Sequence, residues 1–180
     1  IKDYNKMISM NFKNVNNIVL AIGKTEGHLD QSIFARNILD EKNGPPPEIN
    51  LFNEKNNGET LLKLIENNLI KSAHDVSLGG IITAVVKMCI RGNKGINLKK
   101  PKYLINEMEY LFAEDQGRYI IEINKIDLKK VTDILNKNAV HYDELGTINE
   151  NELFINEKTK VTIDELRSFN TRWLKEYMSK

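Results

Sequence analysis

The stretch Ala73-His74-Asp75-Val76-Ser77-Leu78-Gly79-Gly80 runs directly into the almost wholly apolar segment Ile81 to Arg91, and this junction decides the fold class. Residues 71–76 are short and compatible with a β-strand, whereas the apolar segment is long enough to form a buried helix. Two glycines between a strand and a helix are typical of a tight turn. The junction therefore predicts an α/β core near the middle of the chain.

The sequence on both sides continues to alternate between strand and helix patterns. Apolar or alternating runs predict strands over 17–23, 94–98 and 118–123, and terminal strands or a hairpin over 139–148 and 152–163. Apolar positions three and four residues apart predict helices over 32–39, 59–70, 103–111 and 128–138, with a last helix through Met178. We expect a mixed β-sheet flanked by helices, an α/β (α+β) fold.

Boundary residues refine these expectations. Prolines 45–47 end the first helix, Asn57-Gly58 predicts a turn before the second, and Asp127 is a suitable N-cap for the helix over 128–138. The stretch Thr162-Ile-Asp-Glu165 resembles a capping box. We expect one domain over residues 1–180, with residues 1–15 as a connecting segment.

Composition excludes several classes of function. The chain has 180 residues, with 26 Lys and Arg against 25 Asp and Glu, so no strong field favours nucleic acid or an anionic membrane as partner. Its longest apolar run is too short to span a bilayer. The single cysteine, Cys89, excludes an internal disulfide and fits a reducing compartment, so we expect a cytoplasmic protein. Because the chain opens at Ile1 without an initiator Met or a signal sequence, we expect a piece of a longer polypeptide.

The loop after the first predicted strand is the first candidate site. Gly23-Lys24-Thr25 is reminiscent of a P-loop, but Ile18 stands where that motif requires glycine. A glycine-punctuated polar loop after a buried strand nevertheless places backbone N–H groups where an anionic ligand can meet them. The candidates here are Thr25, Gly27, His28 and Gln31; the alternative is that they only shape the loop.

The central junction is the second candidate site. His, Asp and Ser side chains beside the free N–H groups of a helix N-terminus suit a phosphate, or a phosphate with Mg²⁺. The candidates are His74, Asp75, Ser77, Gly79 and Gly80, with Asp75 as a metal ligand. In the alternative, Ser77 caps the helix, Asp75 accepts backbone N–H bonds and His74 is a partly buried histidine whose hydrogen bonds are satisfied.

A third candidate site is the acidic loop Glu114-Asp115-Gln116, which lies between an apolar helix and a strand. Two carboxylates there suit a hydroxyl or metal contact, and a solvated turn is the alternative. No catalytic residue is expected, since no nucleophile, base and orienting group occur together. Cys89 lies among apolar neighbours and should serve packing, and the three histidines show no metal-ligand spacing.

Four stretches in order carry a resemblance to a known family: Ile22 to Ser32, Pro45-Pro46-Pro47 before Asn50-Leu51, Ala73 to Gly80, and Leu111 to Tyr119. Together they resemble the C-terminal domain of the aminoimidazole ribonucleotide synthetase superfamily, in particular that of the second subunit of phosphoribosylformylglycinamidine synthase. The resemblance covers about residues 17–150, and it implies that superfamily's fold.

The resemblance also implies a function. Such enzymes use ATP and Mg²⁺ to convert formylglycinamide ribonucleotide, with ammonia from glutamine, into the amidine in purine biosynthesis. In their first half, residues at the place of His74-Asp75 supply an Mg²⁺ ligand, and residues at the place of Glu114-Asp115-Gln116 hold substrate. This domain would belong to the second half, where it lines an auxiliary ATP or ADP phosphate site and is mainly structural.

The implied partners are the remaining domains of the same polypeptide, a glutaminase subunit and a small accessory subunit, with no nucleic acid or membrane. The isolated domain should be inactive. Two other hypotheses stay open: a non-catalytic regulatory or protein-interaction α/β module, and a complete small enzyme. The last is disfavoured because no set of residues supplies a nucleophile, a base and an electrostatic stabiliser together.

Overall fold

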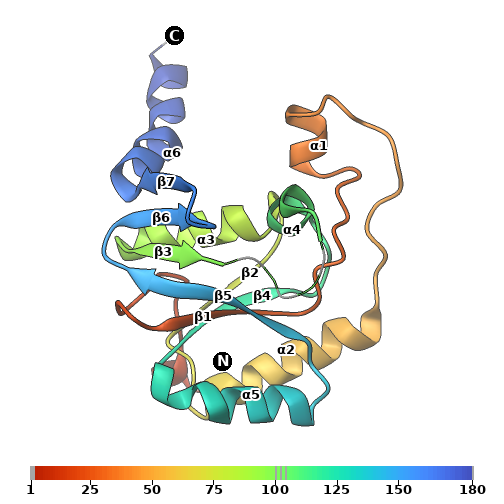
Figure 1. The fold of residues 1–180 in the computed structure, drawn as a ribbon, viewed down its shortest axis with the longest axis vertical. Helices are drawn as coiled ribbons and strands as arrows, with labels where there is room; N and C mark the ends of the chain where they lie inside the picture. The colour runs from red at the N-terminus through yellow and green to blue at the C-terminus, as the bar shows by residue number, and fades with distance from the viewer. Residues whose placement is uncertain (1–2, 100, 102, 104, 180) are drawn as a thin grey trace.

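A seven-stranded mixed sheet with helices on both faces forms the body of the chain (Figure 1). A computed structural model describes residues 3–99, 101, 103 and 105–179. Across the sheet of these described residues, the strand order is β2-β4-β1-β5-β3-β6-β7. The strands are β1 (Ile18–Ile22), β2 (Ser72–Asp75), β3 (Gly95–Leu98), β4 (Tyr119–Ile123), β5 (Tyr142–Asn149), β6 (Glu152–Ile155) and β7 (Thr159–Thr162). The expected mixed sheet flanked by helices is confirmed.

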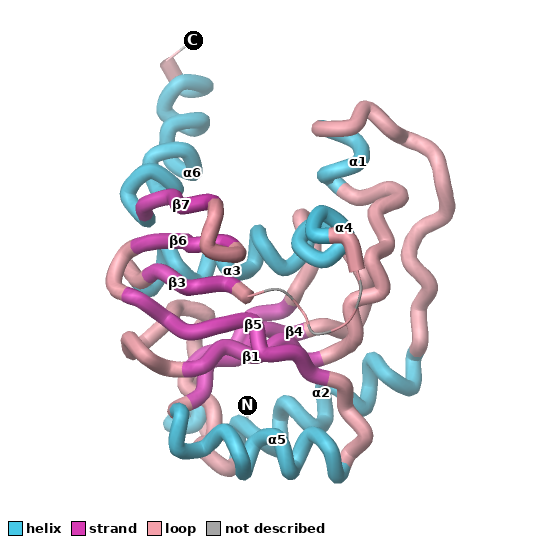
Figure 2. Tube along the Cα trace, viewed as in Figure 1, coloured by secondary structure: helices cyan, strands magenta, loops and turns pink. Residues whose placement is uncertain are grey.

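The helices occupy two layers, one on each face of the sheet (Figure 2). They are α1 (Ile33–Asn37), α2 (Leu51–Glu66), α3 (Gly80–Gly92), α4 (Glu107–Phe112), α5 (Leu128–Lys137) and α6 (Ile163–Met178), with short 3₁₀ helices at Tyr4–Lys6 and Lys125–Asp127. Helices α2 and α5 lie on one face, and α3 lies with α4 on the other. The first turns of α6 pack beside α3, while its later turns project from the body.

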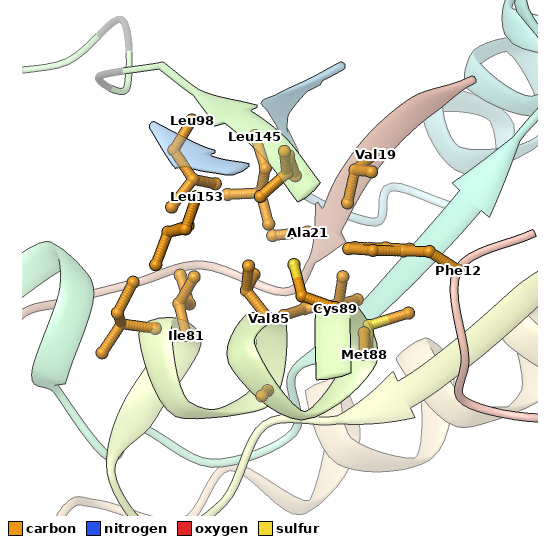
Figure 3. Packing of buried hydrophobic residues seen from close by; sticks show 14 of the residues in the cluster. Phe12, Val19, Ala21, Ile81, Val85, Met88, Cys89, Leu98, Leu145 and Leu153 are labelled. Atoms are coloured by element: carbon orange, nitrogen blue, oxygen red, sulfur yellow. The ribbon is translucent and has the colours of Figure 1, made fainter. Parts of the chain in front are cut away.

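Helix α3 fills the larger of the two cores. Its buried residues include Ile81, Val85 and Met88, which lie under strands β1, β3 and β5 (Figure 3). Cys89 is fully buried in this cluster, and burial raises the pKa of its thiol far above the ordinary value. The expectation that Cys89 serves packing is confirmed.

Two predicted helix starts are wrong. Helix α2 begins at Leu51, so Asn57 and Gly58 lie inside it and form no turn. Asn50 caps it, since the side-chain oxygen of Asn50 accepts a hydrogen bond from the N–H of Asn53 at 3.0 Å. Helix α4 begins at Glu107 and not at 103, because the side chain of Asn106 caps it through the N–H of Met108 at 2.8 Å. Leu104 lies outside the described residues.

One other local expectation also needs correction. Asp127 occupies the N-cap position of α5 but makes no side-chain capping bond, because a 3₁₀ turn leads into the helix. The terminal strands or hairpin expected near the C-terminus are confirmed: β6 and β7 pair antiparallel and are joined by a turn in which Asn156 and Glu157 have positive φ. The capping box at Thr162 and Glu165 is confirmed.

A buried carboxylate fastens the N-terminal segment to the sheet. Glu122 of β4 is fully buried. Its two oxygens accept hydrogen bonds from the backbone N–H groups of Lys13 and Asn14, at 2.8 and 3.0 Å. They also accept bonds from the side chains of Asn17 and Ser72, at 2.7 and 2.9 Å. With Phe12 buried in the α3 core, residues 12–17 are held firmly against the sheet.

Within the part of the chain that the structure describes, no helix combines the length and the apolar character needed to cross a membrane.

Candidate functional site

The sheet register brings the three candidate loops together. Tyr119, at the start of β4, pairs with Ile22 at the end of β1 on one side and with Asp75 at the end of β2 on the other. The loop that follows β1, the turn that follows β2 and the segment that precedes β4 must therefore meet at one edge of the sheet. Asn57 of α2 joins them, since its side-chain amide donates to the carbonyl of Gly117 at 2.9 Å.

Two adjoining hollows open at this edge. The first, about 280 Å³, includes Asp75, Ser77, Glu114 and Gln116 in its lining. The second, about 570 Å³, includes Gly27, His28, Asp115 and Gln116. Gln116 and Glu54 of α2 line both hollows, so most of the predicted site residues lie around one continuous surface.

A buried arginine links the loop after β1 to the segment before β4. The Arg118 side chain has no exposed surface. It donates hydrogen bonds to the carbonyl oxygens of Ala113 and Asp115, at 2.6 and 3.0 Å, and to the hydroxyl of Thr25 at 3.0 Å. Burial lowers the pKa of the Arg118 guanidinium, and the nearby Asp115 carboxylate acts the other way. Thr25 is thus buried and bonded within the protein.

Asp115 is also bonded within the protein. Its carboxylate accepts hydrogen bonds from the backbone N–H groups of Glu26, Gly27 and His28, at 3.0, 3.2 and 3.3 Å. One oxygen lies 3.9 Å from the Arg118 guanidinium, and Asp115 is 8% exposed. The amides expected to face an anionic ligand in this loop therefore already hold a carboxylate.

Glu114 has a similar role at the central junction. One carboxylate oxygen accepts from the N–H of Gly79 at 2.8 Å and from the N–H of Ile33 at 2.9 Å. The N–H of Gly80 donates to the carbonyl of Ser77 at 3.0 Å. Gly80 has a φ of +70°, and a side chain there would press on the backbone around Phe112, so this glycine allows α3 and α4 to approach closely.

The alternative interpretation of the junction is confirmed only for the partial burial of His74, whose side chain is 15% exposed. The N-cap of α3 is Gly79 and makes no side-chain capping bond, so Ser77 is not the cap. The Asp75 carboxylate is 63% exposed and lies 3.1 Å from Nδ1 of His74. Nε2 of His74 is buried without a partner among the described residues. Burial lowers the pKa of His74 from its ordinary value, with Lys87 adding to the effect and Asp75 opposing it.

Gln31 and His28 anchor the long loop that follows α1. The Gln31 side-chain amide donates to the carbonyls of Lys42 and Gly44, at 2.9 and 3.1 Å. Nε2 of His28 lies 2.9 Å from the carbonyl of Pro45. His28 also lines the second hollow, whereas Gln31 does not appear in the lining of either one.

The oxygen atoms around the first hollow suit Mg²⁺ only in part. Carboxylates of Glu54 and Asp75 and the amide of Gln116 are hard donors of the kind that Mg²⁺ prefers. Glu54 and Asp75 line this hollow together with Tyr119, and burial and both carboxylates raise the pKa of Tyr119. Over the described ranges, however, no group of three or more His, Cys, Asp or Glu residues is arranged to hold a metal ion. The donor set therefore fits Mg²⁺ that arrives with phosphates better than a cage made by the protein alone.

Sequence reasoning missed three residues of this edge: Glu54, Asn57 and Arg118. Glu54 and Asn57 were assigned to a loop and a turn because the start of α2 was placed too late. The sequence pattern indicates only the start of a strand at Arg118. The available signal was a charged residue at the start of a strand whose isoleucines are buried, since a charged side chain in such a place requires a partner.

Comparison with known proteins gives the family. The model of the AIR synthase related protein family, C-terminal domain, matches residues 14–156. The chain belongs to this family. The matched range contains both hollows and every predicted site residue, whereas α6 lies beyond it.

Curated relatives point to one enzyme subunit. The chain is 68% identical to the phosphoribosylformylglycinamidine synthase subunit PurL of Pelagibacter ubique (strain HTCC1062) over 99% of its length, and 33% identical to the Bartonella henselae PurL subunit over the same share. It spans about a quarter of the length of these relatives, 24% in both cases.

Solved structures share the fold of the chain. A T. maritima PurL complexed with FGAR matches 91% of this chain and 30% of that one, with a TM-score of 0.76 and 17% identity. A T. maritima PurL complexed with ATP matches 91% of this chain and 27% of that one, with a TM-score of 0.68 and 16% identity.

Proposed function

We propose that the chain is the C-terminal domain of the second subunit of a phosphoribosylformylglycinamidine synthase, with residues 1–180 forming one domain of a longer polypeptide. The whole enzyme would be an ATP-dependent amidoligase that converts formylglycinamide ribonucleotide and glutamine-derived ammonia into the amidine in purine biosynthesis. The observation that carries this proposal is the 68% identity to a PurL subunit over 99% of the chain.

The partners follow from the same relatives. About three-quarters of the related polypeptide lies outside this chain, so its remaining domains are the first partner. A T. maritima assembly named PurLQS contains a chain of the same fold, with a TM-score of 0.69, which supports a glutaminase subunit and a small accessory subunit as further partners. We place the enzyme in the cytoplasm, as its free, buried Cys89 and its place in purine synthesis suggest.

A domain exchange tests the enzymatic role. This chain would replace the corresponding segment of the P. ubique subunit, and formation of the amidine from ATP and ammonia would be measured. The chimera should retain activity, and the isolated chain should have none. A chimera that folds and binds its accessory subunits but forms no amidine contradicts the proposal.

Within that enzyme, we propose that the first hollow faces the phosphates of an ATP or ADP molecule with its Mg²⁺. Asp75 would be the metal ligand, Ser77 and Gln116 would line the hollow beside it, and the neighbouring His74, Gly79 and Gly80 would position this turn. The exposed Asp75 carboxylate supports this assignment. The charge of the lining supports it too. Among the described residues of the lining Arg118 is the one cation, and its hydrogen bonds go to protein oxygens, so no side-chain cation is available to a phosphate. A polyphosphate there needs Mg²⁺ to offset the neighbouring carboxylates.

The nucleotide site can be tested by thermal unfolding in ADP and Mg²⁺, both in the chimera and in the isolated chain. A ligand that binds only the folded state stabilises it by about 2.7 kcal/mol at 100 times its dissociation constant. Asp75→Asn should abolish the Mg²⁺-dependent part of the shift in the chimera. Asp133→Asn, an exposed site on α5, is the control. An equal shift in both variants excludes Asp75 as the metal ligand.

A non-catalytic interaction module remains the second candidate function, and α6 is the observation in its favour. Phe169, Trp173 and Tyr177 of this helix are 64 to 65% exposed, and α6 lies outside the matched family range. A protein of this kind would show no response to ADP with Mg²⁺ in the chimera or in the isolated chain. A response in either arm that depends on Asp75 rules it out.

A further inference from the structure

The carboxylate of Asp115 is held by more donors than a simple ion pair would provide. Three consecutive backbone N–H groups, those of Glu26, Gly27 and His28, point at its two oxygens. Consecutive amides that converge on one point form a concave anion-binding arrangement, and a positive φ within the run helps to create it. Gly27 supplies that conformation, with a φ of +89°.

A buried positive charge completes the arrangement. Arg118 has no exposed side-chain surface, and Asp115 is the carboxylate that the structure places within 4 Å of its guanidinium. The three hydrogen bonds of the Arg118 side chain go to neutral oxygens, the carbonyls of Ala113 and Asp115 and the hydroxyl of Thr25. A buried guanidinium needs a nearby anion, since removal of one partner from a buried ion pair is strongly destabilising.

We propose that the three amides and Arg118 form an anion-binding pocket, and that the protein fills this pocket with its own Asp115 carboxylate. Asp115 is then an internal ligand and a positioning residue, which holds the loop after β1 in place. The inference goes beyond the proposed nucleotide site, because it concerns the second hollow and does not depend on ATP or Mg²⁺. It means that phosphates bound at this edge do not use the amides of residues 26–28 while Asp115 is present.

The second hollow gives an outside anion a route to the pocket. It has a volume of about 570 Å³, and Gly27, His28 and Asp115 all contribute to its lining. An anion that enters it reaches the place of the Asp115 side chain once that side chain is shortened to a methyl group. Inorganic phosphate carries several acceptor oxygens and can therefore accept from the amides and from Arg118 at the same time.

The test removes the internal ligand and supplies an external one. Asp115→Ala in the 180-residue chain should lower the melting temperature, because three amides and a guanidinium lose their anion. Inorganic phosphate at tens of millimolar should then raise that temperature by at least about 3 °C more than it does in the wild type. A merely structural aspartate would give the same loss of stability without this rescue.

Two further variants separate the pocket from a general effect of charge. Asp133→Ala removes an exposed carboxylate on α5 and should respond to phosphate as the wild type does. The double variant Asp115→Ala with Arg118→Met should lose the phosphate response, since it also removes the positive charge. An equal phosphate response in Asp115→Ala and Asp133→Ala overturns the proposal.

If Asp115→Ala does not fold at any phosphate concentration, Asp115→Ser decides the question. The serine leaves room for phosphate and its hydroxyl can accept from an amide, but it carries no charge, so Arg118 still lacks an anion. A phosphate response greater than that of Asp133→Ser supports the pocket, and an equal response overturns it.

Discussion

At the scale of single residues, buried polar groups determine how the loops and the N-terminal segment are held. Glu122 and Arg118 are both fully buried, with side-chain bonds to segments far away in sequence. Each fixes a piece of backbone that would otherwise have no regular partner. Their removal should therefore affect more of the structure than the loss of an apolar residue of similar size.

The four hydrogen bonds that Glu122 accepts lead to the first prediction. Glu122→Ala should lower the free energy of unfolding by about 3 kcal/mol or more, because several buried donors lose their acceptor. Urea denaturation measures the change. Glu150→Ala, at an exposed position after β5, should change the free energy by less than about 0.5 kcal/mol. Similar values for the two variants would contradict the anchoring role of Glu122.

Two glycines provide a matched pair for the second prediction. Gly23 has a φ of +90°, and a Cβ there would lie 2.8 Å from the carbonyl oxygen of Gly117. Gly23→Ala should therefore destabilise the protein by about 1–3 kcal/mol. Gly58 lies inside α2, and a Cβ there would meet the hydroxyl of Tyr119 at 3.5 Å, an ordinary contact, so Gly58→Ala should stabilise by about 0.5–1 kcal/mol. Thermal unfolding should give shifts of opposite sign.

His74 leads to a third prediction, on pH. Burial lowers its pKa in the folded protein, whereas the unfolded chain takes up the proton near the ordinary value of about 6.5. Below that pH the unfolded state binds more protons, so stability falls as the pH drops towards the lowered folded pKa. Between pH 7.5 and 5.5 the wild type should lose more stability than His74→Gln. An equal loss of stability in the two proteins would show that protonation of His74 is not linked to folding.

At the scale of helices and strands, most elements could be predicted from the sequence, because apolar periodicity reports burial directly. Strand β1 and helix α3 lie where continuous apolar runs placed them, within a residue or two. Helix α2 was placed too late, since its first two turns carry mostly polar or exposed side chains and Asn57-Gly58 is a common turn pair. The bond from Asn57 to Gly117 overrides that local preference.

The candidate site was predictable as a set of loops but not as a set of bonds. Sequence motifs predicted the three candidate loops, and the register of β1, β2 and β4 brings these loops together. They gave no sign that Asp115 and Glu114 bond to the amides of residues 26–28 and of Gly79. Contacts of this kind join residues more than 30 positions apart, and no local pattern encodes them.

The corrected start of α2 supplies the fourth prediction. Asn50 caps this helix through the N–H of Asn53, so Asn50→Ala should lower the free energy of unfolding by about 1 kcal/mol. Asn43→Ala, at an exposed loop position, is the control and should have almost no effect. Chemical denaturation of both variants measures the difference. A helix that truly began at 59 would show no difference between them.

At the scale of the whole molecule, α6 exposes large apolar side chains, which is unfavourable for an isolated domain in water. Phe169, Trp173 and Tyr177 of this helix are spaced four residues apart and are all exposed, so they share one face of the helix and give it an apolar surface. We expect the isolated chain to self-associate at high concentration, and Trp173→Ser to weaken that association. Sedimentation analysis of the two proteins measures this. An equally monomeric wild type would mean that the aromatic surface is too small to drive association.

The strand order also has a consequence for biosynthesis. Strand β1 is the first strand of this domain to be made, yet its neighbours on both sides are β4 and β5, about a hundred residues or more further along the chain. Until those strands leave the ribosome, both edges of β1 stay open, and its five residues are all apolar. At roughly 5–20 residues per second, the backbone hydrogen-bonding groups of β1 therefore stay unpaired for several seconds during synthesis. Chaperone binding to this strand should end once residue 149 has emerged and β5 has paired with it.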